Sequence, residues 1–348
     1  MLEVFTKIEV WKSVRQEQSD EVSKKITNGH KFKIRIIVIF KFFLYLFSLF
    51  IAFGNFFIFL IVFLMLNTPI IRKSIFGRLP TDSKEFRKRN VIKYRETFEY
   101  LPGLLLDIFY PSSLESMNRT QSIKGVVLFA HGGGWISGYR RQPNNVSWYR
   151  YLVNKGFIVA TIDYERGYKA GIEKLISELI VALNFLKGHL SSRFGFERKI
   201  SLMGLSAGGH LALLAASRIP EEVDSVVAYY SPCDLLDIWN STSLFARLSA
   251  ATTLKRLPYI DRSVYERYSP INNISPVFPR TLLVHGLKDS VVPYISSLKM
   301  FKKLKELNVK TKLLLHPKGE HGFEFVLRDS KTVDIIEKTA KFLEGELW

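Results

Sequence analysis

Hydrophobic and polar positions follow different patterns before and after residue 90. After it, short apolar runs alternate with longer stretches whose apolar residues recur every three or four positions. This alternation predicts strands and helices in turn. The predicted strands are 104–110, 126–130, 157–163, 200–203, 223–229, 281–285 and 311–315, and the predicted helices are 172–186, 207–216, 296–307 and 331–343. We therefore expect an α/β fold in which helices cover both faces of a mostly parallel sheet.

A long uncharged segment dominates the N-terminal part of the chain. Residues 42–66 hold no charged side chain and consist mainly of Phe, Leu and Ile. As a helix, this segment would be about 37 Å long, enough to cross a hydrocarbon core of about 30 Å. We expect a transmembrane helix and a single-pass membrane protein. Two alternatives stay open, a helical hairpin broken near Gly54, because residues 36–71 hold one charge, Lys41, and a buried core helix.

Basic residues flank the apolar segment on both sides. The chain has a net charge of +18, and residues 1–41 and 72–95 together hold 18 Lys and Arg against 7 Asp and Glu, a net +11. This placement favours attraction to anionic lipid headgroups over nucleic-acid binding, for which the sequence shows no motif. Because both flanks are basic, the side of the membrane that the rest of the chain faces stays open.

The composition divides the chain into four parts. We expect a basic N-terminal segment at 1–41, the membrane anchor at 42–66, a juxtamembrane linker at 67–90 and the α/β domain at 91–348. The linker is rich in charge and turn formers, which predicts that it buries little apolar surface. The single cysteine, Cys233, excludes an internal disulfide and is expected to be a small buried hydrophobe.

A serine flanked by glycines follows the predicted strand 200–203. The residues Gly204-Leu205-Ser206-Ala207-Gly208 lie between that strand and the predicted helix 207–216. A GxSxG sequence needs both elements, because the sharp turn between them lifts the serine hydroxyl above the sheet. The pentapeptide alone is a weak signal, but its context makes Ser206 the candidate nucleophile.

A glycine run follows the predicted strand 126–130. The residues His131-Gly132-Gly133-Gly134-Trp135 are typical of the oxyanion loop of esterases and lipases. Attack on an acyl carbonyl builds negative charge on its oxygen, and each backbone N–H aimed at that oxygen contributes roughly 3 kcal/mol. Glycines allow the close approach that this requires. We expect His131 to hold the loop in shape rather than to transfer protons.

A serine hydroxyl needs a base to take its proton and an acid to orient that base. In chains with this strand-serine-helix turn, the acid and then the histidine follow the serine. Asp289 comes just after the predicted strand 281–285 and is the candidate acid. Asp234 and Asp237, after the preceding strand, are the alternatives.

Seven histidines compete for the role of base. His321 lies in the glycine-bounded loop 318–323, from which it can reach over the sheet to the serine. We predict His321 as the base, with His316, which closes the last strand, as the alternative. The other five are expected to be structural: His30, His131, His189, His210 and His285.

From about residue 105 to the C-terminus, the chain resembles α/β-hydrolase esterases of the hormone-sensitive-lipase and BD-FAE-like groups. The matching pieces are HGGGW at 131–135, GLSAGG at 204–209, HGLKDSVVP at 285–293 and HGF at 321–323. Their order and spacing together are specific. The resemblance implies an α/β-hydrolase fold in which the backbone N–H groups of Gly133, Gly134 and Ala207 are the oxyanion donors.

Two positions depart from these relatives. Residues 163–166 read Asp-Tyr-Glu-Arg where many relatives carry Asp-Tyr-Arg and then a proline-containing stretch, and Leu205 stands where many hormone-sensitive-lipase relatives have an acidic residue. These departures leave the substrate preference and the subfamily open. Residues 235–270, which include Trp239, Phe245 and Tyr259, either cover an acyl pocket or pack as a connecting segment.

The sequence therefore predicts a membrane-anchored serine hydrolase that cleaves carboxylic esters through an acyl-enzyme. An amidase or peptidase of the same fold is the first alternative, and a non-catalytic binding protein is the second. We expect a small-molecule or lipid ester as substrate, membrane lipids as partners, and neither a cofactor nor a metal.

Overall fold

The computed structural model describes residues 77–83, 94–112 and 123–346. The chain divides into two compact units, Met1–Leu64 and Met65–Trp348. The first unit, and with it nearly all of the predicted membrane segment 42–66, lies outside the described residues, as do residues 65–76 and 84–93. In the described part of the chain, no helix is long and apolar enough to cross a membrane.

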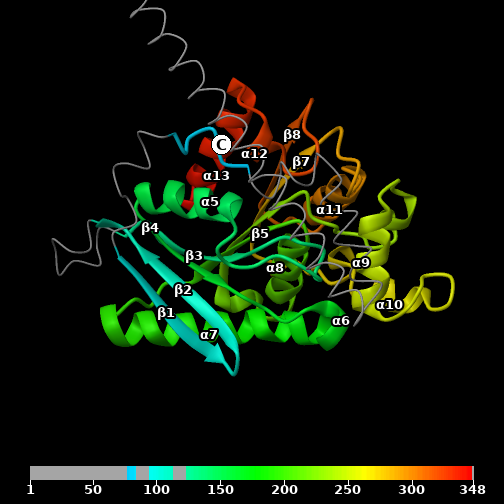
Figure 1. Ribbon diagram of the computed structural model, residues 1–348. Coiled ribbons are helices and arrows are strands. Elements are labelled where there is room, and N and C mark those ends of the chain that lie inside the picture. The colour runs from blue at the N-terminus through cyan, green and yellow to red at the C-terminus, as the bar shows by residue number, and fades with distance from the viewer. Residues whose placement is uncertain (1–76, 84–93, 113–122, 347–348) are drawn as a thin grey trace, which may run out of the picture. The chain divides into compact units, whose positions relative to one another are not determined.

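An eight-stranded sheet forms the centre of the second unit, with the order β1-β2-β4-β3-β5-β6-β7-β8 (Figure 1). The strands are β1 Tyr94–Leu101, β2 Leu104–Tyr110, β3 Gly125–Ala130, β4 Phe157–Ile162, β5 Ile200–Leu205, β6 Val223–Tyr229, β7 Arg280–Gly286 and β8 Thr311–His316. Strand β2 pairs antiparallel with both β1 and β4, and all other pairs are parallel. The predicted mostly parallel sheet is confirmed.

Helices cover both faces of this sheet. They are α5 Pro143–Asn154, α6 Gly167–Ala170, α7 Ile172–Phe194, α8 Ala207–Arg218, α9 Leu244–Leu254, α10 Arg262–Arg267, α11 Ile295–Glu306, α12 Phe323–Val326 and α13 Ser330–Leu343. Short 3₁₀ turns span Pro220–Glu222, Asp237–Asn240 and Pro270–Asn272. Residues of α7, α8 and α11 share one hydrophobic core, whereas α5 and α13 share the other. Figure 1 shows α5 and α13 on the opposite side of the sheet from α7 and α8.

All seven predicted strands form, with ends that differ by at most two residues. Their central members were easy to predict because every residue of β4 and β5 is buried, which gives continuous apolar runs. The apolar pattern did not predict β1, whose charged residues leave it half-exposed at the sheet edge. It also missed α5, which begins with the polar run Pro143-Asn144-Asn145, and α9 and α10.

The described part of the predicted linker packs onto the α/β domain. Leu79 is only 1% exposed and belongs to the same core as α5 and α13. Its N–H donates to Ser147 Oγ of α5 at 3.0 Å, and Asp82 lies 3.5 Å from Arg150 of the same helix. The expectation of little apolar burial thus does not hold at Leu79, because a single leucine within a charged segment finds a place in the core.

Candidate active site

The turn that carries Ser206 joins β5 to α8. Ser206 has φ 52° and ψ −118°. Residues other than glycine rarely adopt this backbone conformation, and the strain that it implies is typical of functional sites. Its N–H donates to Tyr229 O of the neighbouring strand at 2.8 Å. A Cβ on Gly204 would lie 2.3 Å from Gly208 C, and one on Gly208 would lie 2.1 Å from Ala130 O. The two glycines are therefore required by close backbone contacts that hold the turn.

The structure brings Ser206, His321 and Asp289 together in one hydrogen-bonded row. His321 lies between β8 and α12, and Asp289 follows β7. With its proton on Nδ1, His321 donates to Asp289 Oδ2 at 2.8 Å, and its Nε2 accepts from the Ser206 hydroxyl at 3.0 Å. Asp289 Oδ1 accepts from the N–H groups of Val291 and Val292 at 2.8 and 2.9 Å. This is the order of groups that activates a serine hydroxyl.

The Asp289 carboxyl is completely buried. Burial acts to raise its pKa, but the charge of His321 and hydrogen bonds from His285 and His321 outweigh burial and hold the pKa of Asp289 well below its usual value. His285 Nε2 lies 3.3 Å from Asp289 Oδ2, and His285 also contacts Ser297 Oγ and Val292 O. The acid therefore stays ionised, as it must in order to orient an imidazole and stabilise its charged form.

The alternative residues for base and acid lie elsewhere. His316 Nε2 contacts Asp329 Oδ1 at 3.1 Å, at the start of α13. Asp234 and Asp237 both bind the Lys299 ammonium, at 3.0 and 2.6 Å. None of these three residues is recorded in contact with Ser206 among the residues that the structure describes.

His131 is buried beneath the glycine loop rather than exposed at the serine. Its ring stacks on Tyr164 with centroids 4.1 Å apart, and its Nδ1 lies 2.7 Å from Gly132 O. Burial lowers the pKa of His131 to about 4, so the imidazole is neutral at physiological pH. This environment suits a residue that supports the loop.

The glycine loop lies against the nucleophile turn. A Cβ on Gly132 would be 3.1 Å from Leu205 O and 3.6 Å from Ser206 Cβ, while Gly133 and Gly134 adopt φ 126° and 61°. Ala207 is the first residue of α8, where a helix cannot satisfy its own N–H. Within the described residues, no backbone hydrogen bond is recorded from the N–H of Gly133, Gly134 or Ala207. These three N–H groups are the oxyanion donors that the resemblance implies, and Gly133 and Gly134 line the same pocket as Ser206.

A pocket is lined by Ser206, His321 and the three glycines. Its other lining residues are of two kinds, the polar Ser137, Gln142 and Asn144 and the largely apolar Leu205, Tyr230, Phe245, Val291 and Phe325. Of the aromatic residues expected to cover an acyl pocket, Phe245 does line it. Trp239 and Tyr259 pack edge-on against each other, 5.9 Å apart, so that part of 235–270 is a connecting segment.

Tyr230 and Glu324 complete the surroundings of His321. The Tyr230 ring lies 4.5 Å from the His321 ring, and its hydroxyl donates to Glu324 Oε1 at 2.7 Å. Glu324 is fully buried, and burial raises its pKa to about 7. The pattern of the sequence held no sign of this pair, since Glu324 lies on a four-residue helix and Tyr230 directly follows a buried strand. Among the described residues, no cluster of three or more His, Cys, Asp and Glu is arranged to hold a metal.

Comparisons with known proteins find relatives that are named as esterases. A probable isoprenylcysteine alpha-carbonyl methylesterase of Oryza sativa subsp. japonica is 28% identical over 236 residues, which cover 61% of this chain and 56% of the relative. Esterase LipC of Mycobacterium tuberculosis is 26% identical over 276 residues, which cover 74% of this chain and 66% of the relative. The chain thus spans 56% of the length of the first of these curated relatives and 66% of the length of the second.

Solved structures show the same fold. A truncated carbohydrate esterase from gut microbiota superimposes with a TM-score of 0.62 over 74% of this chain and 98% of that one, at 19% identity. The model of the BD-FAE family matches residues 106–304, which is more than half of the 348 residues and includes the glycine loop, Ser206 and Asp289. This chain therefore belongs to the BD-FAE family and has the α/β-hydrolase fold.

Proposed function

We propose that this protein is a carboxylic ester hydrolase with Ser206 as nucleophile, His321 as base and Asp289 as acid. The observation that carries the proposal is the row of two hydrogen bonds, 2.8 Å from His321 to Asp289 and 3.0 Å from Ser206 to His321. Membership of the BD-FAE family and the esterase names of two relatives support an ester as the substrate.

The proposed reaction has two halves. In the first, Ser206 Oγ attacks the ester carbonyl carbon while His321 Nε2 takes the hydroxyl proton, and the ionised Asp289 stabilises the imidazolium. The carbon–oxygen bond to the alcohol then breaks, and the alcohol leaves with the proton from Nε2. In the second half, water attacks the acyl-enzyme in the same way, and Ser206 regains its proton as the acid leaves.

The carbonyl oxygen becomes negative in both halves. The N–H groups of Gly133, Gly134 and Ala207 are the proposed donors to it, because they adjoin Ser206 and have no recorded backbone acceptor in the described part of the protein. A preorganised donor of this kind is worth about 3 kcal/mol of transition-state stabilisation. His131 supports this loop through the contact of its Nδ1 with Gly132 O and through its stacking on Tyr164.

The proposal extends to small-molecule or lipid esters. The rice relative is named for a methyl ester on an isoprenylated cysteine, which is an ester attached to a lipid group. An amidase or peptidase of the same fold is the alternative, and it differs in that the leaving group is an amine. Nitrophenyl esters of increasing acyl length, compared with the anilide of the preferred acyl group, distinguish these substrates.

Membrane attachment through residues 42–66 is also part of the proposal. It is supported by the absence of charge from these 25 residues and by the basic residues on both sides. The full chain should stay in the membrane pellet in alkaline carbonate, whereas attachment by basic residues alone would be lost as screening rises. Release of the full chain by carbonate would contradict a spanning segment.

Ser206→Ala tests the catalytic proposal. Hydrolysis of nitrophenyl acetate should fall by several orders of magnitude, because residues that act as a catalytic unit lose nearly all activity together. Ser217→Ala is the matched control, since Ser217 also lies on α8 and its hydroxyl donates to Leu214 O of the same helix, and it should keep full activity. Substantial turnover by pure Ser206→Ala would overturn the assignment.

A further inference from the structure

The glycine loop needs several restraints to hold one backbone conformation. Residues 132–134 are three consecutive glycines, which have more backbone freedom than any other residue. Oxyanion donors, however, must sit within about 0.2 Å of their best distance to the substrate oxygen. Within the loop, Gly133 O accepts from the Ile136 N–H, the Ser137 N–H and Ser137 Oγ at 3.2, 3.0 and 2.9 Å. Further restraints come from outside it.

A single five-residue segment supplies hydrogen bonds to the loop from outside. Residues 163–167 follow β4 and contact the loop on both sides of its three glycines. Before the glycines, the Tyr164 hydroxyl donates to His131 O at 2.7 Å, and its ring stacks on the His131 ring. After them, the Gly167 N–H donates to Trp135 O at 2.8 Å.

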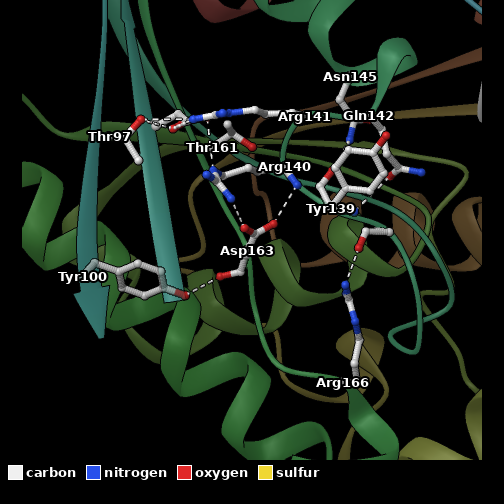
Figure 2. Close-up of polar contacts among 12 residues, drawn as sticks. Thr97, Tyr100, Tyr139, Arg140, Arg141, Gln142, Asn145, Thr161, Asp163 and Arg166 are labelled. Carbon is white, nitrogen blue, oxygen red and sulfur yellow. Dashed lines mark hydrogen bonds and ion pairs between the residues drawn. The ribbon is translucent and has the colours of Figure 1, made fainter. Parts of the chain in front are cut away.

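Two charged residues of the same segment hold the far end of the loop. Arg166 Nη2 donates to Gly138 O at 2.5 Å. Asp163 Oδ1 accepts from the Arg140 N–H at 2.9 Å, and its other oxygen pairs with the Arg140 guanidinium. Figure 2 shows Asp163 between Arg140 on one side and Tyr100, whose hydroxyl donates to Asp163 O at 2.8 Å, on the other.

The loop is folded so tightly here that a displacement at its far end reaches the glycines. A Cβ on Gly138 would lie 2.2 Å from Gly132 O and 2.6 Å from His131 Nδ1. Gly138 thus touches the residue next to the proposed donors. A shift of Gly138 O, which Arg166 holds, would therefore move Gly132 as well.

The Arg140 end is fixed further by a buried carboxylate. Asp107 on β2 is fully buried, and Arg140 Nε lies 3.1 Å from its Oδ2. Arg141 donates two hydrogen bonds to Asp107, at 2.6 and 2.8 Å, and Thr97 donates a third at 2.7 Å. Burial acts to raise the pKa of Asp107, but these bonds and both guanidinium charges hold it below its usual value. Arg140 therefore joins β2 and the segment that follows the neighbouring strand β4 to the loop.

We propose that Asp163, Tyr164 and Arg166 are positioning residues that hold the backbone of the glycine loop at Ser206. The inference rests on the proposed function, because it says that these contacts position the oxyanion donors used in ester hydrolysis. It also gives a role to the segment 163–166, in which this chain departs from the Asp-Tyr-Arg of the families it resembles. The segment itself is tied to α7 through the Glu165 N–H, which donates to the buried Glu178 carboxyl at 2.9 Å.

Arg166→Met and Asp163→Asn test the proposal by steady-state hydrolysis of nitrophenyl acetate. A donor loop displaced by a fraction of an ångström acts on the transition state and not on substrate binding. The kcat should therefore fall about ten- to hundred-fold while KM changes little. Affinity for a trifluoromethyl ketone, which forms a tetrahedral oxyanion on the serine, should fall by the same factor as kcat/KM. Arg166→Lys, which keeps a donor, should recover part of the loss.

Arg218→Met is the matched control. Arg218 pairs with Glu173 at 2.6 and 2.8 Å, and neither residue belongs to the segment 163–167 or to the glycine loop. Unchanged kcat in folded Arg166→Met, or an equal loss in Arg218→Met, would overturn the inference. If Asp163→Asn does not fold, Arg166→Met decides alone, since Arg166 is partly exposed. An active Ser206→Ala would instead refute the proposed function.

Discussion

The glycine loop, residues 131–140, and the base loop, residues 318–323, meet at Ser206, yet they are held in different ways. The backbone of the glycine loop is hydrogen-bonded by side chains from a separate segment, among them the charged Asp163 and Arg166. The base loop is held through its backbone. Gly319 O accepts from the Lys288 N–H at 2.9 Å, and a Cβ on Gly286 would lie 2.2 Å from that same oxygen.

The difference follows from what each loop contributes. The glycine loop offers backbone donors from residues that carry no side chain, so contacts with neighbouring residues must fix them. The base loop offers a side chain, His321, which is fixed by Asp289 on one side and by the Tyr230 ring on the other. We infer that a loop of backbone donors needs hydrogen bonds from another segment to hold its backbone in place. A loop with a reactive side chain needs only contacts that orient that side chain.

The largest effect is expected at the base loop. Asp289→Asn should lower kcat about 10⁴-fold, because the asparagine amide favours the wrong imidazole tautomer. His321→Ala should lower it at least as much. His316→Ala is the control and should keep kcat within a few-fold, since His316 binds Asp329 instead. Steady-state kinetics on nitrophenyl acetate would contradict the comparison if His316→Ala were the more damaging change.

A smaller effect is expected from a single methyl group in the glycine loop. In Gly134→Ala the added Cβ would lie 2.8 Å from Ser249 Oγ and 2.9 Å from Phe245 Cζ. The displaced N–H should cost about 10²-fold in kcat. Gly195→Ala is a matched control, because Gly195 has nearly the same φ, 62° against 61°, and no heavy atom within 4 Å of the added Cβ. An equal loss of kcat in both variants would show that the strained backbone conformation, and not the contact with Ser249 and Phe245, causes the loss.

Behind the base loop, Glu324 should affect stability rather than the chemical step. Its pKa is raised by burial from 4.5 to about 7, so between these values the folded protein holds a proton that the unfolded chain has released. Its stabilising contribution is complete below about pH 4.5 and is lost as pH rises through 7, a change on the order of 3 kcal/mol. Urea unfolding of Glu324→Gln should show a smaller fall in stability across this window than the parent protein. An unchanged pH dependence would contradict the buried ionisation of Glu324.

The smallest effect on turnover is expected at Leu79, which is remote from both loops in sequence. A truncated protein that begins at residue 67 keeps Leu79, whereas one that begins at residue 84 removes it from the core. The shorter protein should lose about 2 kcal/mol of unfolding free energy yet keep kcat while folded. Leu79→Ala in the longer protein is the control and should reproduce most of the loss. Equal stability of the two truncated proteins would contradict the packing of Leu79.

Residues with a strict local requirement could be predicted from the sequence. Ser206, Gly204 and Gly208 lie in a turn that tolerates few alternatives, and Asp289 and His321 follow strands whose apolar runs are plain. Strand β4 was found as readily, because all of its residues are buried.

The remaining features depend on contacts between distant parts of the chain. Arg140 and Asp163 are 23 positions apart, and Tyr230 and Glu324 are 94 positions apart. A charged or aromatic residue in one segment gives no sign of its partner in another. Leu79 is a similar case, since one leucine in a charged segment shows no periodicity.

The most direct test of the central claim is to find the residue that an active-site-directed fluorophosphonate modifies. The reagent needs an activated serine beside oxyanion donors, so peptide mass spectrometry of the labelled full-length protein should find the adduct on Ser206 alone. Labelling should slow strongly in His321→Ala and stay unchanged in His316→Ala. An adduct on another serine, or no adduct on the folded protein, would contradict the assignment of Ser206 as the nucleophile.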